Sequence, residues 1–270
     1  MTVDARKGNT PDACHEGISD TEELLARYPR RRDLQPCLRV GAQHRPTRDL
    51  PGRGRDDDHA WALYRWNLDL AATFTALSCD VEVTLRNTIH DRLTSHFGRD
   101  DWWASTDLVL DDITSETLTE VVRRHRKQLA KGTIGAGKVL ADLMLGTWVM
   151  LLGRGGTSAL GRAIDYEANL WRPALRFGFA TGSLTPSGRV RRPTRDAVHQ
   201  RASNLQRLRN RAAHHEPIFD GIWLAGTKDR IDLLTVWEQA VELLGWMNPD
   251  LAGVHRATPT LPHVFAARPS

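Results

Sequence analysis

The chain has 270 residues, of which 40% are hydrophobic and 26% charged, and its 37 basic and 33 acidic residues leave a net charge of +4. This length corresponds to one or two domains with a sizeable core, and the composition is typical of a globular protein. The three scattered cysteines are too few for a disulfide framework or a four-ligand zinc site, so we expect a cytoplasmic protein in a reducing compartment. The longest apolar stretch is too short to span a bilayer, which predicts no membrane partner.

The two ends of the chain differ in composition from its middle. Residues 1–55 are rich in arginine, proline and glycine and lack a sustained apolar period, which predicts a poorly ordered or weakly structured segment. Residues 56–247 carry helical patterns throughout. Residues 248–270 contain several prolines, so we expect an extended tail.

Hydrophobic periodicity predicts an all-α fold for the middle of the chain. After the acidic run 56–58, apolar residues recur at steps of three and four, which predicts a helix to about His96 that stops at Gly98. Further helices are predicted over 118–129, 139–152, 158–179 with a break at Pro173, 198–212 and 233–244, the last with Asp229 as a candidate N-cap. The segment 139–152 is apolar on almost every side, which favours a buried central helix.

Positive charge is concentrated in residues 187–211. This segment holds eight arginines and a single acid, Asp196. Such a density of arginine is typical of a phosphate-binding surface. It fits a solvated helix face preceded by a mobile basic loop equally well.

The segment LRNRAAHHEPIF (208–219) follows this basic run and contains Arg209, Asn210 and His214. Cleavage of RNA by its own 2′-hydroxyl needs a proton acceptor, a proton donor and a cation for the charge that develops on the phosphoryl oxygens. Histidine can move the protons and arginine can bind phosphate in a bidentate manner, so no metal ion or other cofactor is required. On an ideal helix, however, Arg209 and His214 differ by about 140°, so either the helix deforms or two subunits combine their residues. Capping of the helix end is the alternative role for such a pair.

Other polar residues are candidates for the surroundings of this site. Arg207 and Arg211 share a helix face with His214, and the candidate RNA contacts are Arg201, Arg207, Arg211 and His215. His215 could also be a second acid or base, although we expect it and Glu216 to position the loop. Arg86, Asn87 and His90 repeat the motif with one residue fewer, and we expect Arg86 and Asn87 to support the site through polar contacts.

Four blocks of the chain resemble, in order, the abortive-infection (Abi-like, AbiD/AbiF-type) proteins of bacteria. These blocks are LYRWNLDLAATFTALSCDVEVTLRNTIHDRL (63–93), GKVLADLMLGTWVMLL (137–152), YEANLWRPALRFGF (166–179) and LRNRAAHHEPIF (208–219). The resemblance covers about residues 58–247. Residues 1–55 do not resemble the usual N-terminal region of the family, which fits a divergent extension, a shifted reading frame or a misassigned start.

The resemblance implies an all-α, HEPN-like helical bundle. HEPN domains are often metal-independent ribonucleases in phage defence or in toxins, and their signature is arginine, a polar residue, several variable residues and histidine. Arg209, Asn210 and His214 match this R-N-x-x-x-H pattern. The resemblance also implies a homodimer with its active sites across the two-fold axis, which would ease the angular problem, and an antitoxin or a phage-derived trigger as a partner.

Two other functions fit the same residues. The chain could be a non-catalytic RNA-binding or sensor protein that uses the basic face alone. It could also be a helical interaction module that binds an antitoxin or a phage component, with Arg209 and His214 purely structural. Fold alone does not separate these functions, because one fold hosts both active and inactive proteins.

Overall fold

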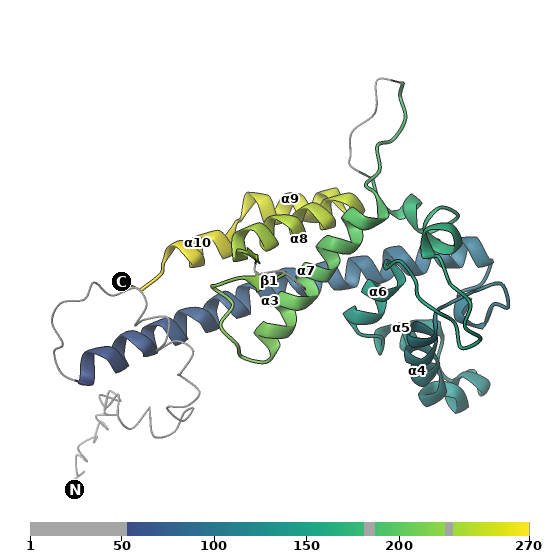
Figure 1. The fold of residues 1–270 in the computed structure, drawn as a ribbon, viewed down its shortest axis with the longest axis horizontal. Coiled ribbons are helices and arrows are strands. Elements are labelled where there is room, and N and C mark those ends of the chain that lie inside the picture. The colour runs from purple at the N-terminus through teal and green to yellow at the C-terminus, as the bar shows by residue number, and fades with distance from the viewer. Residues whose placement is uncertain (1–52, 181–186, 225–228, 270) are drawn as a thin grey trace, which may run out of the picture.

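The computed structural model describes residues 53–180, 187–224 and 229–269, and over these residues it is mostly helical, with very little strand (Figure 1). The all-α prediction is therefore confirmed for this part of the chain. A weakly structured segment was predicted over residues 1–55, of which residues 1–52 lie outside the described part of the chain. Its last three residues already belong to a helix, which begins at Arg53 and not at Asp56.

The helix α3 (Arg53–Phe97) runs along the length of the molecule and contacts most of the other elements (Figure 1). Its 45 residues correspond to a length of about 68 Å. The apolar stripe predicted from the sequence, at Leu63, Trp66, Leu70, Phe74, Leu77 and Val81, is buried, and the buried face continues at Leu85, Ile89 and Leu93. The helix ends at Gly98, whose φ of 70° is readily adopted only without a side chain.

Two helices pack along the N-terminal half of α3, namely α8 (Leu233–Met247) and α10 (Thr260–Ala266), while α9 (Pro249–Ala257) packs on α8. The prediction of an extended tail after Asn248 is wrong. The Asn248 side chain caps α9 by accepting from the Leu251 amide at 3.1 Å, and Pro249 occupies the first helical turn, where proline is tolerated. The predicted cap of α8 was also misplaced, since Asp232, not Asp229, accepts from the Thr235 amide.

Toward its other end α3 contacts the one-turn helix η2 (Trp102–Ala104) and α6 (Leu145–Leu151), and α4 (Asp112–Ala130) packs on α6 and on α5 (Ala136–Ala141). The prediction of one central helix over 139–152 is wrong, because the chain breaks between α5 and α6. At this break the Asp142 carboxylate lies 2.7 Å from His125 of α4 and 2.8 Å from Lys138. Both contacts lower the pKa of Asp142, with Lys138 the larger cause. The break lets α5 pack on α4 while α6 packs on α3 and α7.

The segment after α6 contains less helix than predicted over 158–179. Thr157 pairs with Ala163 in a short antiparallel bridge, and only then do a π-helical turn, η3 (Glu167–Trp171), and a 3-10 turn, η4 (Leu175–Gly178), follow. Gly155 precedes the bridge with a φ of 83°, and a Cβ at this position would overlap the carbonyl oxygen of Ile164. Pro173 lies between the two helical turns, at the predicted break.

The helix α7 (Arg195–Ala213) crosses α3 and packs between α6 and α8 (Figure 1). Thr194 caps its start by accepting from the Ala197 amide. A hairpin of β1 (Ile222–Trp223) and β2 (Arg230–Ile231) follows the helix. None of the helices in the described ranges combines the length and the apolar character needed to cross a membrane.

Candidate functional site

The LRNRAAHHEPIF segment forms the last turns of α7 and the loop that follows it. Leu208 and Ala212 are buried against the core, and the helix ends at His214. The next residue, His215, has a φ of 57°, a left-handed conformation that is uncommon for residues other than glycine. This conformation turns the chain sharply away from the helix axis, and both histidine side chains lie exposed at the turn.

The turn is held from the inside by Arg211. Its guanidinium donates from Nη1 to the carbonyl of Gly221 at 2.6 Å and from Nη2 to the carbonyl of Pro217, and its Nε lies 3.2 Å from the Glu216 carboxylate. Glu216 thus contacts the residue that holds the turn, and its predicted role in support of the site stays a prediction. Arg211 was predicted to contact RNA, but the fold itself uses its guanidinium.

Asn67 of α3 fixes the same turn to the core. Its side-chain Oδ1 accepts from the Ile218 amide at 2.8 Å, and its Nδ2 donates to the Glu216 carbonyl at 3.3 Å. The side chain is 2% exposed, so both backbone groups would lack a partner without it. Sequence reasoning did not identify this residue. Its signal was an amide next to the apolar stripe, directly after Trp66.

The three predicted catalytic residues reach the surface on different sides of α7. Arg209 is 38% exposed and turns toward α3, where its guanidinium lies 3.8 Å from the Glu82 carboxylate. Asn210 and His214 are exposed one turn apart on the solvent side. Within the described part of the chain, no hydrogen bond or ion pair joins the side chains of these three residues. The angular separation expected on a regular helix therefore persists, because α7 stays helical to Ala213.

The basic segment is divided by its internal contacts. Arg201, a predicted RNA contact, pairs with Glu242 at 2.6 Å and lies over the Trp246 ring at 4.7 Å. Arg195 is 7% exposed and bonds to Glu167, Asp196 and the Leu152 carbonyl. Both side chains hold helices together, which argues against a role in RNA binding. Arg207 is exposed on α7 and remains a candidate RNA contact.

The shorter motif on α3 lies in a different environment. The Arg86 Nε donates to the Asn87 side chain at 3.5 Å, and Arg86 follows Glu82 by one helical turn. The Nδ1 of His90 accepts from the indole of Trp102 at 3.2 Å, and Trp102 is fully buried. No hydrogen bond or ion pair in the described ranges links Arg86 or Asn87 to α7. The support of the site predicted for Arg86 and Asn87 stays a prediction. It is based on their position about one turn after Glu82, the residue that Arg209 contacts.

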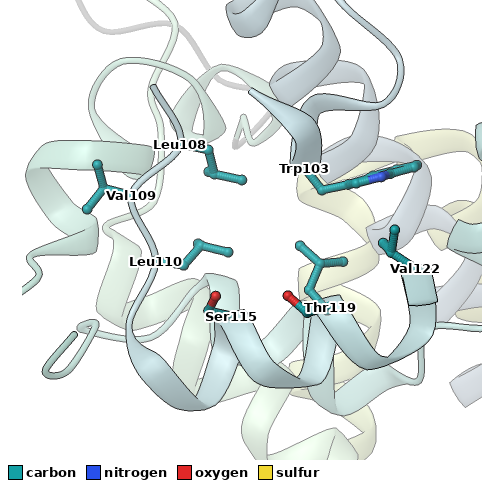
Figure 2. A pocket seen from close by; sticks show the side chains of 8 residues that line it. Trp103, Leu108, Val109, Leu110, Ser115, Thr119 and Val122 are labelled. Carbon is teal, nitrogen blue, oxygen red and sulfur yellow. The ribbon is translucent and has the colours of Figure 1, made fainter. Parts of the chain in front are cut away.

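A groove of about 330 Å³ opens between the segment 103–110 and α4. Trp103, Leu108 and Leu110 surround it, and the hydroxyls of Ser115 and Thr119 face it from the helix (Figure 2). No arginine or lysine lines this groove, so it lacks the cations that attract a phosphate backbone. In the ranges 53–180, 187–224 and 229–269, no group of three or more histidine, cysteine, aspartate and glutamate side chains could hold a metal ion.

Comparison with known protein families, with curated proteins and with solved structures finds no match to this chain. A function for the chain therefore has to be inferred from its own residues and their geometry.

Removal of the Asn67 side chain should destabilise the protein. In Asn67→Ala the buried amide of Ile218 and carbonyl of Glu216 lose their partner, which costs about 1–3 kcal/mol of the free energy of unfolding. Urea denaturation measures this loss. Asp69→Ala, on the exposed side of the same helix, should change the stability by less than about 0.5 kcal/mol. Equal losses in both variants would show that Asn67 does not anchor the turn.

His199 of α7 makes the stability depend on pH. Its imidazole is half-buried beside Ser203, and burial, followed by the charge of Arg195, lowers its pKa below the usual value. Below about pH 6.5 the unfolded chain therefore binds a proton that the folded chain does not, so stability should fall as the pH falls.

His199→Gln should remove this contribution. Between about pH 7.5 and about pH 5.5 the variant should lose less of its free energy of unfolding than the wild type does. His263→Gln serves as a control, because His263 lies exposed on α10, and it should keep the wild-type dependence. Identical pH profiles for the wild type and His199→Gln would contradict the role of His199.

Proposed function

We propose that this chain is a metal-independent endoribonuclease of the HEPN type, from the Abi-like family, that acts in the cytoplasm in phage defence or as a toxin. In this proposal the helices around α3 and α7 form a HEPN-like bundle. The observation that carries it is the end of α7, where Arg209, Asn210 and His214 reach solvent beside a turn that Asn67 and Arg211 hold rigid. A rigid scaffold that presents an arginine and a histidine is what acid–base cleavage of RNA requires.

Each of the three residues has a separate role in the proposed reaction. His214 takes the proton of the RNA 2′-hydroxyl or returns one to the leaving 5′-oxygen. Arg209 stabilises the negative charge that develops on the phosphoryl oxygens. Asn210, one turn before His214 on the same face, orients the imidazole or the phosphate. Proton transfer and charge stabilisation by these side chains need no metal ion.

A two-fold dimer would bring these groups together. Arg209 turns toward Glu82 of its own chain, whereas His214 is exposed at the end of α7. A second protomer that approaches the exposed face of α7 could present its own Arg209 to this histidine, so that each site takes one residue from each chain. The guanidinium has five N–H donors, and one long contact to Glu82 leaves others for a phosphate.

The RNA would approach along the exposed face of α7. Arg207 and His215 border the proposed catalytic residues and are exposed, so they are the contacts that we assign to the strand. An antitoxin or a phage-derived trigger would control the activity by covering or releasing the same face.

A non-catalytic RNA-binding or sensor function is the second candidate. The observation that favours it is the divergence of Arg209 and His214 within one protomer, because a surface that only binds phosphates needs no convergence of the two side chains. This function would give salt-sensitive RNA binding without a cleaved product.

RNA cleavage in the presence of EDTA tests the proposed activity. The wild type should cleave total tRNA without a divalent metal ion, and His214→Ala and Arg209→Ala should each cleave at least about 100-fold more slowly, the lower range for loss of general acid–base catalysis. His263→Ala is the matched control, since it removes an exposed histidine far along the chain, and it should cleave at the wild-type rate. Cleavage by His214→Ala at the wild-type rate would remove His214 from the site. Binding without a product in the wild type would favour the sensor function.

A further inference from the structure

A basic cavity lies at the opposite end of α7 from His214. Its volume is about 580 Å³, which falls within the range typical of small-molecule sites, about 300–1,000 Å³. The walls come from the helical turns η3 and η4 and from the segment that leads into α7. Arg176, Phe177 and Arg192 line its exposed rim, and Trp171 and Arg195 are its buried members.

Two guanidiniums share one aromatic ring at this rim. The Arg176 guanidinium carbon lies 4.7 Å from the centroid of the Phe177 ring, and that of Arg192 lies 5.4 Å from the same centroid. The two positive charges are therefore within about one Debye length of each other at 0.1 M salt, and they repel. A cation–π contact holds a guanidinium in place but supplies no counter-charge and uses none of its hydrogen-bond donors in the plane.

The carboxylates of the cavity do not neutralise these two arginines. Glu167 pairs with Arg172 and Arg195, each at 3.2 Å, and Asp196 pairs with Arg195. Within the described residues, no carboxylate lies within ion-pair distance of Arg176 or Arg192. The rim therefore holds two adjacent cations whose charge and donors are directed to solvent, an arrangement that an anion would stabilise.

The aromatic ring adds a second kind of recognition. Phe177 is 45% exposed although it is a large apolar side chain, and the planar guanidiniums of Arg176 and Arg192 lie close to its ring. Exposed aromatic rings and arginine planes are the surfaces on which nucleic-acid bases stack. Phosphate oxygens match the donors of the guanidinium fork. A ligand with both a planar base and a phosphate could therefore contact the aromatic ring and the two guanidiniums at the rim.

We propose that this cavity binds a nucleotide through its phosphate and its base, either as a free nucleotide or as one unit of an RNA strand. Arg176 and Arg192 bind the phosphate, and Phe177 stacks on the base. Arg195 only supports the site, since it is buried and its guanidinium is already bonded to Glu167, Asp196 and Leu152. The start of α7 and His214 are 19 residues apart, or about 28 Å along the helix, so this site is separate from the proposed catalytic residues and does not depend on their activity.

Titration calorimetry of the full chain with AMP and with inorganic phosphate tests this site. AMP should bind saturably and more tightly than phosphate. Arg192→Ala and Arg176→Ala should each weaken AMP binding by at least about tenfold, the loss expected for a charged hydrogen-bond partner. Phe177→Ala should weaken the binding of AMP more than that of phosphate. Arg126→Ala, which removes an exposed arginine of α4, should change neither.

A second titration distinguishes the two sources of the nucleotide. Both ligands are tested in the His214→Ala background, with and without Arg192→Ala. If the site holds one unit of a strand, Arg192→Ala should weaken the binding of a labelled single-stranded RNA of ten nucleotides. If the site holds a free nucleotide, Arg192→Ala should weaken the binding of AMP but not that of the RNA. His214→Ala by itself should leave AMP binding unchanged, so failure of the proposed catalysis would not affect this result. The proposal is overturned if neither AMP nor RNA binds saturably, if phosphate binds as tightly as AMP, or if Arg126→Ala weakens binding as much as Arg192→Ala does.

Discussion

Burial of the apolar stripe of α3 is the constraint on which the rest of the structure depends. A helix of about 68 Å is longer than a compact domain of this size is wide, so no single layer of helices can cover it. The chain covers it in two parts, with α8 and α10 on the first half and α6 and η2 toward the second, and α7 crosses between them (Figure 1). The turn after α7 takes its position from the same helix, because the Asn67 side chain binds both Glu216 and Ile218. The presentation of His214 at the surface is thus a consequence of how α3 is covered.

The sequence was sufficient to predict those helices whose apolar residues recur with a regular helical period. The buried stripes of α3 and α7 follow a period of 3.6 residues, and each helix was predicted to within a few residues. The segment 139–152 is apolar on nearly every side, so its pattern could not show where a helix ends. The break lies at Asp142, which contacts His125 of another helix. The helices after Asn248 were missed because their prolines were read as signs of an extended chain, whereas Pro249 starts a helix.

The candidate site was predictable as a set of residues but not as an arrangement. The types and spacing of Arg209, Asn210 and His214 are visible in the sequence, and all three reach the surface. Whether an arginine binds a ligand or holds the fold together depends on partners far along the chain. Arg201 meets Glu242, 41 residues away, and Arg211 meets the backbone of the following loop. Local sequence does not encode such contacts. For the same reason, the pattern of the basic segment 187–211 did not show that its first arginines line one cavity whereas its last arginines lie at the other end of α7.

Mixing two inactive variants gives the most direct answer on whether Arg209 of one protomer acts with the partner's His214. Arg209→Ala and His214→Ala would be purified separately, unfolded and refolded together, and assayed for RNA cleavage in EDTA beside each variant refolded alone. If every site combines the two protomers, half of the dimers are mixed and each has one site with both residues intact, so the mixture should recover about a quarter of the wild-type activity. A mixture that cleaves no faster than its separate components would contradict a catalytic site shared between two protomers.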